Sequence, residues 1–239
     1  MFSSPKFLAV YSGVLTVAFA VVVLCGAAIV RKQNFGVITA RRINIVEPDG
    51  TVRLTISNRA DFPGAWNRGK EDPRPDRREA AGMLFMSEEG TELGGLIWGA
   101  AQLPDGSIQN HAHLSFDEYE QNQIFAIDAG QEGNDKFSRI SIVDQGDFPI
   151  EEKRRANDEI DKLPAAQQDT AWGKFFATHR HDVQRMVLGR SPDGSVGIKL
   201  LDNQGNVRIT LTVQKDGTPA LAFLDQSGKV VREISTPSR

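Results

Sequence analysis

The chain has 239 residues, of which 40% are hydrophobic and 25% are charged, and its formal net charge is −3. This composition is ordinary for a globular protein, and the near-neutral charge excludes the basic stripe that a nucleic-acid-binding protein needs. Cys25 is the only cysteine, so an intrachain disulfide is excluded and the redox compartment stays open.

The segment from Phe7 to Val30 contains no charged residue and is rich in Val, Ala, Leu and Phe. As an α-helix, about 24 residues extend roughly 36 Å, which is enough to cross a hydrocarbon core of about 30 Å. Charged residues flank the run on both sides, Lys6 before it and Arg31 after it. We therefore predict a short tail over residues 1–6 and a transmembrane helix over residues 7–30 that holds the protein in the lipid bilayer of the cell membrane.

Two processing events are alternatives to a permanent anchor. A cleaved signal peptide usually has an apolar core of about 7–15 residues that ends at a small-x-small site. Here the run is longer, and Cys25-Gly26-Ala27 is a marginal site at its far end. Lipoprotein processing at Cys25 needs a small residue before the cysteine, where Leu24 stands. The uncleaved, single-pass anchor fits the sequence better than either.

Charges at the two ends of the helix leave its orientation open. Lys6 and the terminal amine lie on one side, whereas four basic residues follow on the other, namely Arg31, Lys32, Arg41 and Arg42. The positive-inside rule then favours a cytoplasmic body. An N-terminal anchor ahead of a large domain is also how bacteria export such a domain, so the sequence leaves the side of the membrane unresolved.

Residues 31–148 are predicted to be a β-rich region that begins with a hairpin. Residues 37–46 have the composition of a strand, and a Pro-Asp-Gly turn follows at residues 48–50. Over residues 52–56, apolar and polar side chains alternate. This period of two is typical of a strand with one buried face.

Residues 59–80 interrupt the alternation. They contain three prolines, mixed charges and the isolated Trp66, without periodicity. A loop of about 20 residues inside a compact domain is usually functional or mobile. We predict a loop here, either a surface insertion or a lid over a site.

Strands are predicted to resume after this loop. The runs that indicate them are apolar or alternating and lie at residues 83–86, 93–99, 110–116, 124–127 and 137–143. Adjacent Gly94 and Gly95 indicate a bulge or a close approach of two backbones within the second run.

Residues 149–183 are predicted to be a helical insertion. The first part is strongly charged, and Pro164 separates it from a second helix for which Asp169 or Thr170 is the expected cap. The second helix is indicated by residues at helical spacing, which are Trp172, Phe175, Phe176, His179 and Val183. We expect this aromatic stripe to pack on the sheet as core and not to hold a cofactor.

Residues 184–239 carry the most regular pattern of the chain. Turns recur at intervals of 11 or 12 residues, and their glycines are Gly194, Gly205, Gly217 and Gly228. Similar strand-and-turn sequences occur early, at residues 52–56 and 83–90. Repeated units of this kind predict a meander or a solenoid-like stack of hairpins, in which no unit can bury its apolar face alone.

The overall prediction is a mainly β fold: a transmembrane helix, then a meander or solenoid-like β-repeat domain with a short helical pair inserted. Residues 36–148 and 184–239 are expected to pack together as one domain. Because no unit buries its face alone, neighbouring units or other chains must cover it.

Two segments carry a resemblance. GMLFMSEEGTELGGLIWG over residues 82–99 and HLSFDEY over residues 113–119 resemble a group of uncharacterised bacterial proteins that combine an N-terminal anchor with a β-rich body. The resemblance extends over most of the chain. It implies an anchored bacterial β-protein of unknown role and brings no active site with it.

All four histidines occur as His-x-His pairs, His111 with His113 and His179 with His181. Residues i and i+2 of a strand share a face, so His111 and His113 could hold one metal ion. They lie opposite the apolar Ala112, Leu114 and Phe116, which predicts that the histidines face water. A site with all four histidines would require the second helix to end early. We therefore assign no metal ligand.

Other chemistry is not indicated. The sequence contains no phosphate-binding loop, dinucleotide fingerprint, serine elbow or cysteine nucleophile in the body, and its Asp-Gly turns lack the spacing of a calcium-binding loop. The acidic pairs Glu88-Glu89 and Asp117-Glu118 fall in predicted turns, where carboxylates are usually solvated. We assign no catalytic or cofactor-binding residue.

Two functions follow as hypotheses. The first is a membrane-anchored structural or interaction module without catalysis, forming a homo-oligomer or a subunit of a membrane protein complex. The second is a membrane-tethered protein that binds a ligand or a metal with His111 and His113, with the loop at residues 59–80 gating the site.

Overall fold

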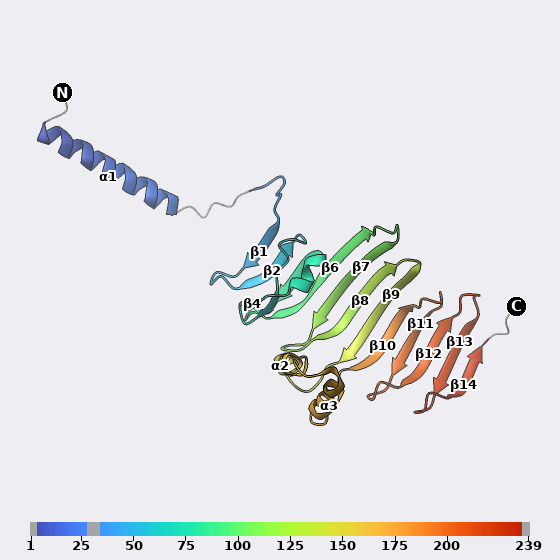
Figure 1. Cartoon of the computed structure of the whole chain (residues 1–239). Coiled ribbons are helices and arrows are strands. Elements are labelled where there is room, and N and C mark those ends of the chain that lie inside the picture. Colours follow the sequence, from blue (N-terminus) through green and yellow to red (C-terminus); the bar gives the residue numbers. More distant parts are fainter. Residues whose placement is uncertain (1–3, 28–33, 236–239) are drawn as a thin grey trace. The chain divides into compact units, whose positions relative to one another are not determined.

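The computed structural model describes residues 4–27 and 34–235, in two units, Met1–Ala40 and Arg41–Arg239. The first unit contains helix α1 (Pro5–Ala27), shown in blue in Figure 1. This helix is long and apolar enough to cross a membrane, a property that signal sequences share. The predicted N-terminal apolar helix is thereby confirmed, except that residues 28–30 lie outside the described residues.

The second unit is built on one antiparallel sheet of 12 strands that follow one another across the sheet in chain order (Figure 1). The strands are β1 (Arg42–Val46), β2 (Val52–Ser57), β5 (Ala81–Met86), β6 (Glu92–Gln102), β7 (Ile108–Asp117), β8 (Gln123–Glu132), β9 (Asp135–Asp144), β10 (Val183–Arg190), β11 (Val196–Leu201), β12 (Val207–Val213), β13 (Pro219–Leu224) and β14 (Val230–Ser235). The mainly β prediction is confirmed as an open meander. The described strands form neither a closed barrel nor a solenoid-like stack.

Tight turns join most of the strands, as the sequence predicts. The glycines of the four C-terminal turns all have positive φ, between +81° at Gly205 and +89° at Gly217, a conformation that costs glycine little. Aspartates complete several turns; the Asp193 carboxylate accepts hydrogen bonds from the backbone N–H and the hydroxyl of Ser195. These bonds hold the pKa of Asp193 below its ordinary value. The first strand is shorter than predicted, because it begins at Arg42 and not at residue 37.

The prediction of an irregular loop over residues 59–80 is wrong. This segment, here called the cover segment, contains β3 (Ala65–Asn67), β4 (Lys70–Asp72) and the 3-10 helix η1 (Pro75–Glu79). Phe62 is buried and packs with Val52, Leu84 and Met86 of the sheet. Strands of three residues are too short to show a period of two, which is why the sequence pattern misses them.

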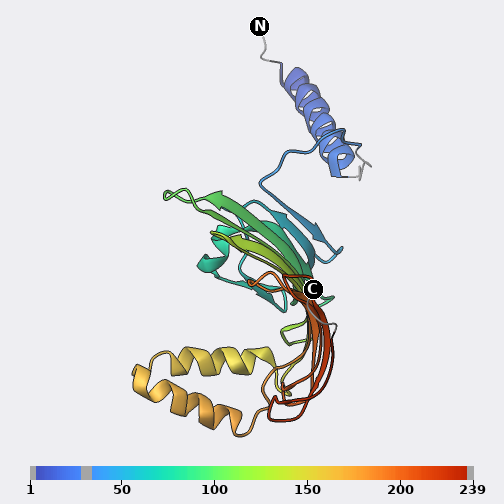
Figure 2. The same cartoon turned by 90° about the vertical axis from the view of Figure 1, so that its right-hand side faces the viewer.

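The helical insertion is confirmed as a pair, α2 (Ile150–Ile160) and α3 (Ala165–Phe176), but its details differ from the prediction. Helix α3 starts directly after Pro164 and ends at Phe176, so neither Asp169 nor Thr170 is its cap and Val183 lies in β10. The two helices project from the sheet as a hairpin (Figure 2).

The expected packing of the aromatic stripe on the sheet is also wrong. The rings of α3 contact one another and Phe148, a buried residue of the loop before α2; the centroids of Phe148 and Phe175 are 5.2 Å apart. His181 stacks on Phe176 at 3.6 Å. The hairpin therefore has a small aromatic cluster of its own.

The register gives the sheet two unlike faces. On the covered face, five successive cross-strand neighbours from β2 to β8 are Thr55, Leu84, Gly95, Ser115 and Ala126. Four of these five residues are small, and Phe62 of the cover segment packs against the fifth, Leu84. The other face, here called the apolar face, carries the large aliphatic and aromatic side chains.

Candidate functional site

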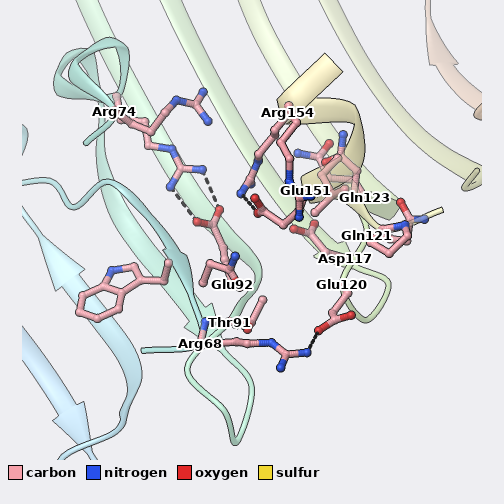
Figure 3. A pocket seen from close by; sticks show the side chains of 17 residues that line it. Arg68, Arg74, Thr91, Glu92, Asp117, Glu120, Gln121, Gln123, Glu151 and Arg154 are labelled. Atoms are coloured by element: carbon pink, nitrogen blue, oxygen red, sulfur yellow. Dashed lines mark hydrogen bonds and ion pairs between the residues drawn. The ribbon is translucent and has the colours of Figure 1, made fainter. Parts of the chain in front are cut away.

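Two surfaces of the second unit are candidates for function: a polar cleft on the covered face and the opposite apolar face. The polar cleft lies between the sheet, the cover segment and the start of α2, and Figure 3 shows its larger part. It consists of two cavities of about 580 and 320 Å³ that share Arg74, Arg77, Glu92 and Gln123.

Three arginine–glutamate pairs line the larger cavity. Arg77 of η1 donates two hydrogen bonds of 2.8 Å to Glu92 of β6, in the bidentate geometry that fixes a guanidinium most firmly. Arg154 of α2 donates to Glu151, and Arg68 donates to Glu120 (Figure 3). The pairs of Arg77 and Arg68 connect the cover segment with β6 and with the turn after β7, whereas the pair of Arg154 lies within α2.

Asp117, at the end of β7, is the unpaired carboxyl of this cleft. Its Oδ1 atom is buried and has no hydrogen-bond partner among the described residues. Burial, and after it the negative charge of Glu92, raises the pKa of Asp117 to about 7, although Arg77 and other cations act in the opposite direction. The sequence analysis places Asp117 in a solvated turn, and the structure corrects this, because the strand extends to Asp117.

The predicted water-facing orientation of His111 and His113 is wrong in part. Both lie on the covered face and line the smaller cavity; His111 is exposed, but His113 is half-buried. Phe116, on the opposite face, is 48% exposed. The error arises because the apolar residues of β7 point to the side that the described chain leaves uncovered.

His113 belongs to a hydrogen-bonded row across three strands. Its Nδ1 lies 2.7 Å from Oδ1 of Asp128 on β8, and Nε of Arg139 on β9 donates to Oδ2 of Asp128 at 3.0 Å. Burial acts to raise the pKa of Asp128, but the bonds from His113 and Arg139 outweigh it and hold the pKa below its ordinary value. With Nδ1 assigned as the donor, the buried Nε2 of His113 is an acceptor without a partner among the described residues.

The second histidine pair does not join the first. Helix α3 does end early, but Nδ1 of His179 lies 2.7 Å from the Phe175 carbonyl oxygen, and its Nε2 lies 3.2 Å from Glu152. Within residues 4–27 and 34–235, no group of three or more His, Cys, Asp or Glu side chains is placed to hold a metal ion. The four-histidine site is therefore not assembled.

The acidic pair Glu88 and Glu89 has structural partners. Arg53 pairs with Glu88, and the hydroxyl of Tyr119 donates to Glu89 at 2.6 Å. The sequence analysis missed Asp128 and the Arg77–Glu92 pair. Only the strand register brings Asp128 opposite His113, and that register follows from the turn between β7 and β8, which the sequence does contain.

The apolar face is the second candidate surface, and a single row of side chains crosses it from edge to edge. Each of the 12 strands contributes one aliphatic residue or methionine to this row, and each residue is the cross-strand neighbour of the next. The central row consists of Ile43, Ile56, Met83, Leu96, Leu114, Ile127, Ile140, Leu188, Ile198, Leu211, Leu221 and Ile234.

Flanking rows extend the apolar face on both sides of the central row. On one side, the Phe85 and Phe116 rings stack at 6.1 Å, because Gly94 on the strand between them has no side chain. On the other side lie Trp98 and Val196, which are 45% and 51% exposed. Within these three rows the charged residues are Arg190 and Arg232. The cover segment and the helical hairpin both lie on the opposite side (Figure 2).

Comparison with known proteins adds no assignment. No protein-family model matches the chain, and a search of the curated proteins finds no matching relative. The functional argument therefore depends on the residues of these two surfaces.

Proposed function

We propose that the protein is a membrane-tethered, non-catalytic assembly module that docks to another protein surface through its apolar face. The observation that carries the proposal is the central row, which runs uninterrupted through all 12 strands. Helix α1 supplies the tether in this proposal, as a permanent single-pass anchor in the cell membrane.

The size of the apolar face supports docking. Twelve strands spaced about 4.8 Å apart, with three rows about 6.7 Å apart, span roughly 58 by 20 Å, or on the order of 1,100 Å². The largest apolar patch on a typical monomer covers about 300–600 Å². Exposed apolar patches larger than this mark interaction surfaces. Covering the apolar face is favourable, because removing apolar area from water stabilises by about 25 cal/mol per Å².

Paired substitutions on β12 test this proposal. Leu211 lies on the apolar face and Thr212 on the covered face, so Leu211→Glu places a charge in the docking surface and Thr212→Glu does not. The full-length protein is crosslinked in native membranes and sized. We expect Leu211→Glu to abolish a larger species that Thr212→Glu retains. A wild-type protein that runs as a monomer without partners contradicts the proposal.

The anchor has a separate test. We expect the protein to stay with membranes after alkaline carbonate extraction, and release into the supernatant contradicts a spanning α1. Protease treatment of intact cells then shows which side of the membrane carries the body.

A second candidate function is ligand binding in the polar cleft. Oδ1 of Asp117 and Nε2 of His113 are buried polar atoms without partners among the described residues, and an incoming ligand could supply the missing hydrogen bonds. A metal version would use His111 and His113 with solvent or the ligand as further donors. Elemental analysis of the purified protein, compared with a His111→Ala, His113→Ala double variant, tests it. Absence of bound metal in the wild type removes the metal version.

A further inference from the structure

We propose that the surface that covers the apolar face is the same face of a second copy of this chain, so that two sheets form a face-to-face sandwich. This inference rests on the proposed docking function and names the partner.

The apolar face is compatible with its own copy because it carries almost no charge. Its three rows contain no acidic residue, and the charged side chains in them are Arg190 and Arg232. A partner selected by charge would require a complementary set of charges, which these rows lack. Two copies of the apolar face have the same size and can pack together without complementary charges.

The area also fits a dimer. About 1,100 Å² from each copy gives roughly 2,200 Å² in total, just above the standard range of about 1,200–2,000 Å² for stable interfaces. Packed sheets lie about 10 Å apart, a distance that side chains from the two faces fill completely. A three-fold arrangement of sheets about 58 Å wide would instead enclose a void that these side chains cannot fill.

Symmetry and the tether select one arrangement. A two-fold axis along the strands keeps both β1 strands starting at the same end, as two chains anchored in one membrane require. Six strands lie on each side of the boundary between β8 and β9, so an axis over this boundary uses the whole face. It places β8 of one copy over β9 of the other.

The same axis avoids conflict at the charged positions. It places β10 over β7, so Arg190 lies over Ala112, one of three alanines in this row. It places Arg232 of the edge strand β14 over the edge strand β1, where the guanidinium reaches solvent. Anchoring both chains in one membrane raises their effective concentration and favours this pairing further.

A lipid surface is the less suitable occupant. Surface-bound apolar elements normally carry a basic rim that attracts anionic headgroups, and the apolar face has two arginines on a chain of net charge −3. A sheet of 12 strands is also twisted, whereas a bilayer surface is nearly flat.

Single cysteines placed by this geometry test the inference. In a Cys25→Ser background, Ile127→Cys on β8 lies next to the proposed axis, Ile45→Cys lies on the edge strand, and Glu132→Cys lies on the covered face of β8. Membranes are treated with a bis-maleimide of about 10 Å reach, which matches the sheet spacing. We expect at least a tenfold higher dimer yield for Ile127→Cys than for the other two variants.

A double variant tests the proposed pairing of the edges. Ile45→Cys combined with Arg232→Cys places one thiol on β1 and one on β14 in the same flanking row, so the two face each other across the two copies. We expect this combination to restore the dimer that Ile45→Cys alone lacks. Ile140→Cys on β9 repeats the axis measurement if Ile127→Cys does not fold, as judged by circular dichroism.

The outcomes separate the two proposals. Equal dimer yields from all single variants overturn the second copy as partner. A crosslink from Ile127→Cys to a different protein also overturns it but leaves docking through the apolar face intact. If Leu211→Glu has no effect on any larger species, the proposed function fails as well.

Discussion

Asp117 is a carboxyl whose ionised form is disfavoured by its surroundings in the described structure. It is half-buried beside the ion-paired Glu92, its Oδ1 has no hydrogen-bond partner among the described residues, and its pKa rises to about 7. Because the folded pKa lies above the ordinary value of 3.8, the folded state holds this proton more tightly than the unfolded chain does. Asp117 therefore costs no stability at low pH, and the cost grows as the pH rises from about 4 to 7.

We expect Asp117→Asn to stabilise the protein more at pH 8 than at pH 5, because the amide has no charge to desolvate. The gain at pH 8 is on the order of 2–4 kcal/mol, at about 1.4 kcal/mol per pKa unit and with allowance for partial exposure. Denaturant unfolding at the two pH values measures it. Glu118→Gln, on the exposed neighbour, is the control. Equal effects of Asp117→Asn at both pH values would show that Asp117 is already ionised without cost.

The turns are the elements that the sequence predicts most reliably, because aspartate and glycine act locally. Helix ends and the cover segment are predicted less well. Helix α3 begins after Pro164, and its rings find partners in Phe148, which is distant in sequence. The cover segment is held by Phe62 and by Arg77, and both contacts depend on where the sheet lies. Local sequence patterns do not show which distant segments come into contact.

Two glycine substitutions compare the backbone requirement of a turn with that of a helix. A Cβ added at Gly217 or at Gly173 meets no atom within 4 Å, so neither substitution is limited by space. Gly217 has φ +89° in a turn, whereas Gly173 lies inside α3. We expect Gly217→Ala to destabilise the protein by about 1 kcal/mol and Gly173→Ala to stabilise it by about 0.5–1 kcal/mol. Thermal unfolding measures both, and effects of the same sign would refute the explanation.

For the whole molecule, the most informative disagreement concerns which face of the sheet is buried. The alternation in β7 predicts that Ala112, Leu114 and Phe116 face the core, yet the described chain leaves this side open and covers the side of His113. We attribute the difference to the proposed docking, in which a second surface covers the apolar face of the sheet.

The covering of the apolar face is most directly measured by the order in which two neighbouring cysteines react. In the chain alone, Leu211 is 50% exposed and Thr212 is less exposed. Leu211→Cys and Thr212→Cys, each in the Cys25→Ser background, are labelled with a water-soluble maleimide in native membranes. If the apolar face is docked, Cys at 212 reacts faster than Cys at 211. Faster reaction at 211 would show that the apolar face is open to water and would contradict the account.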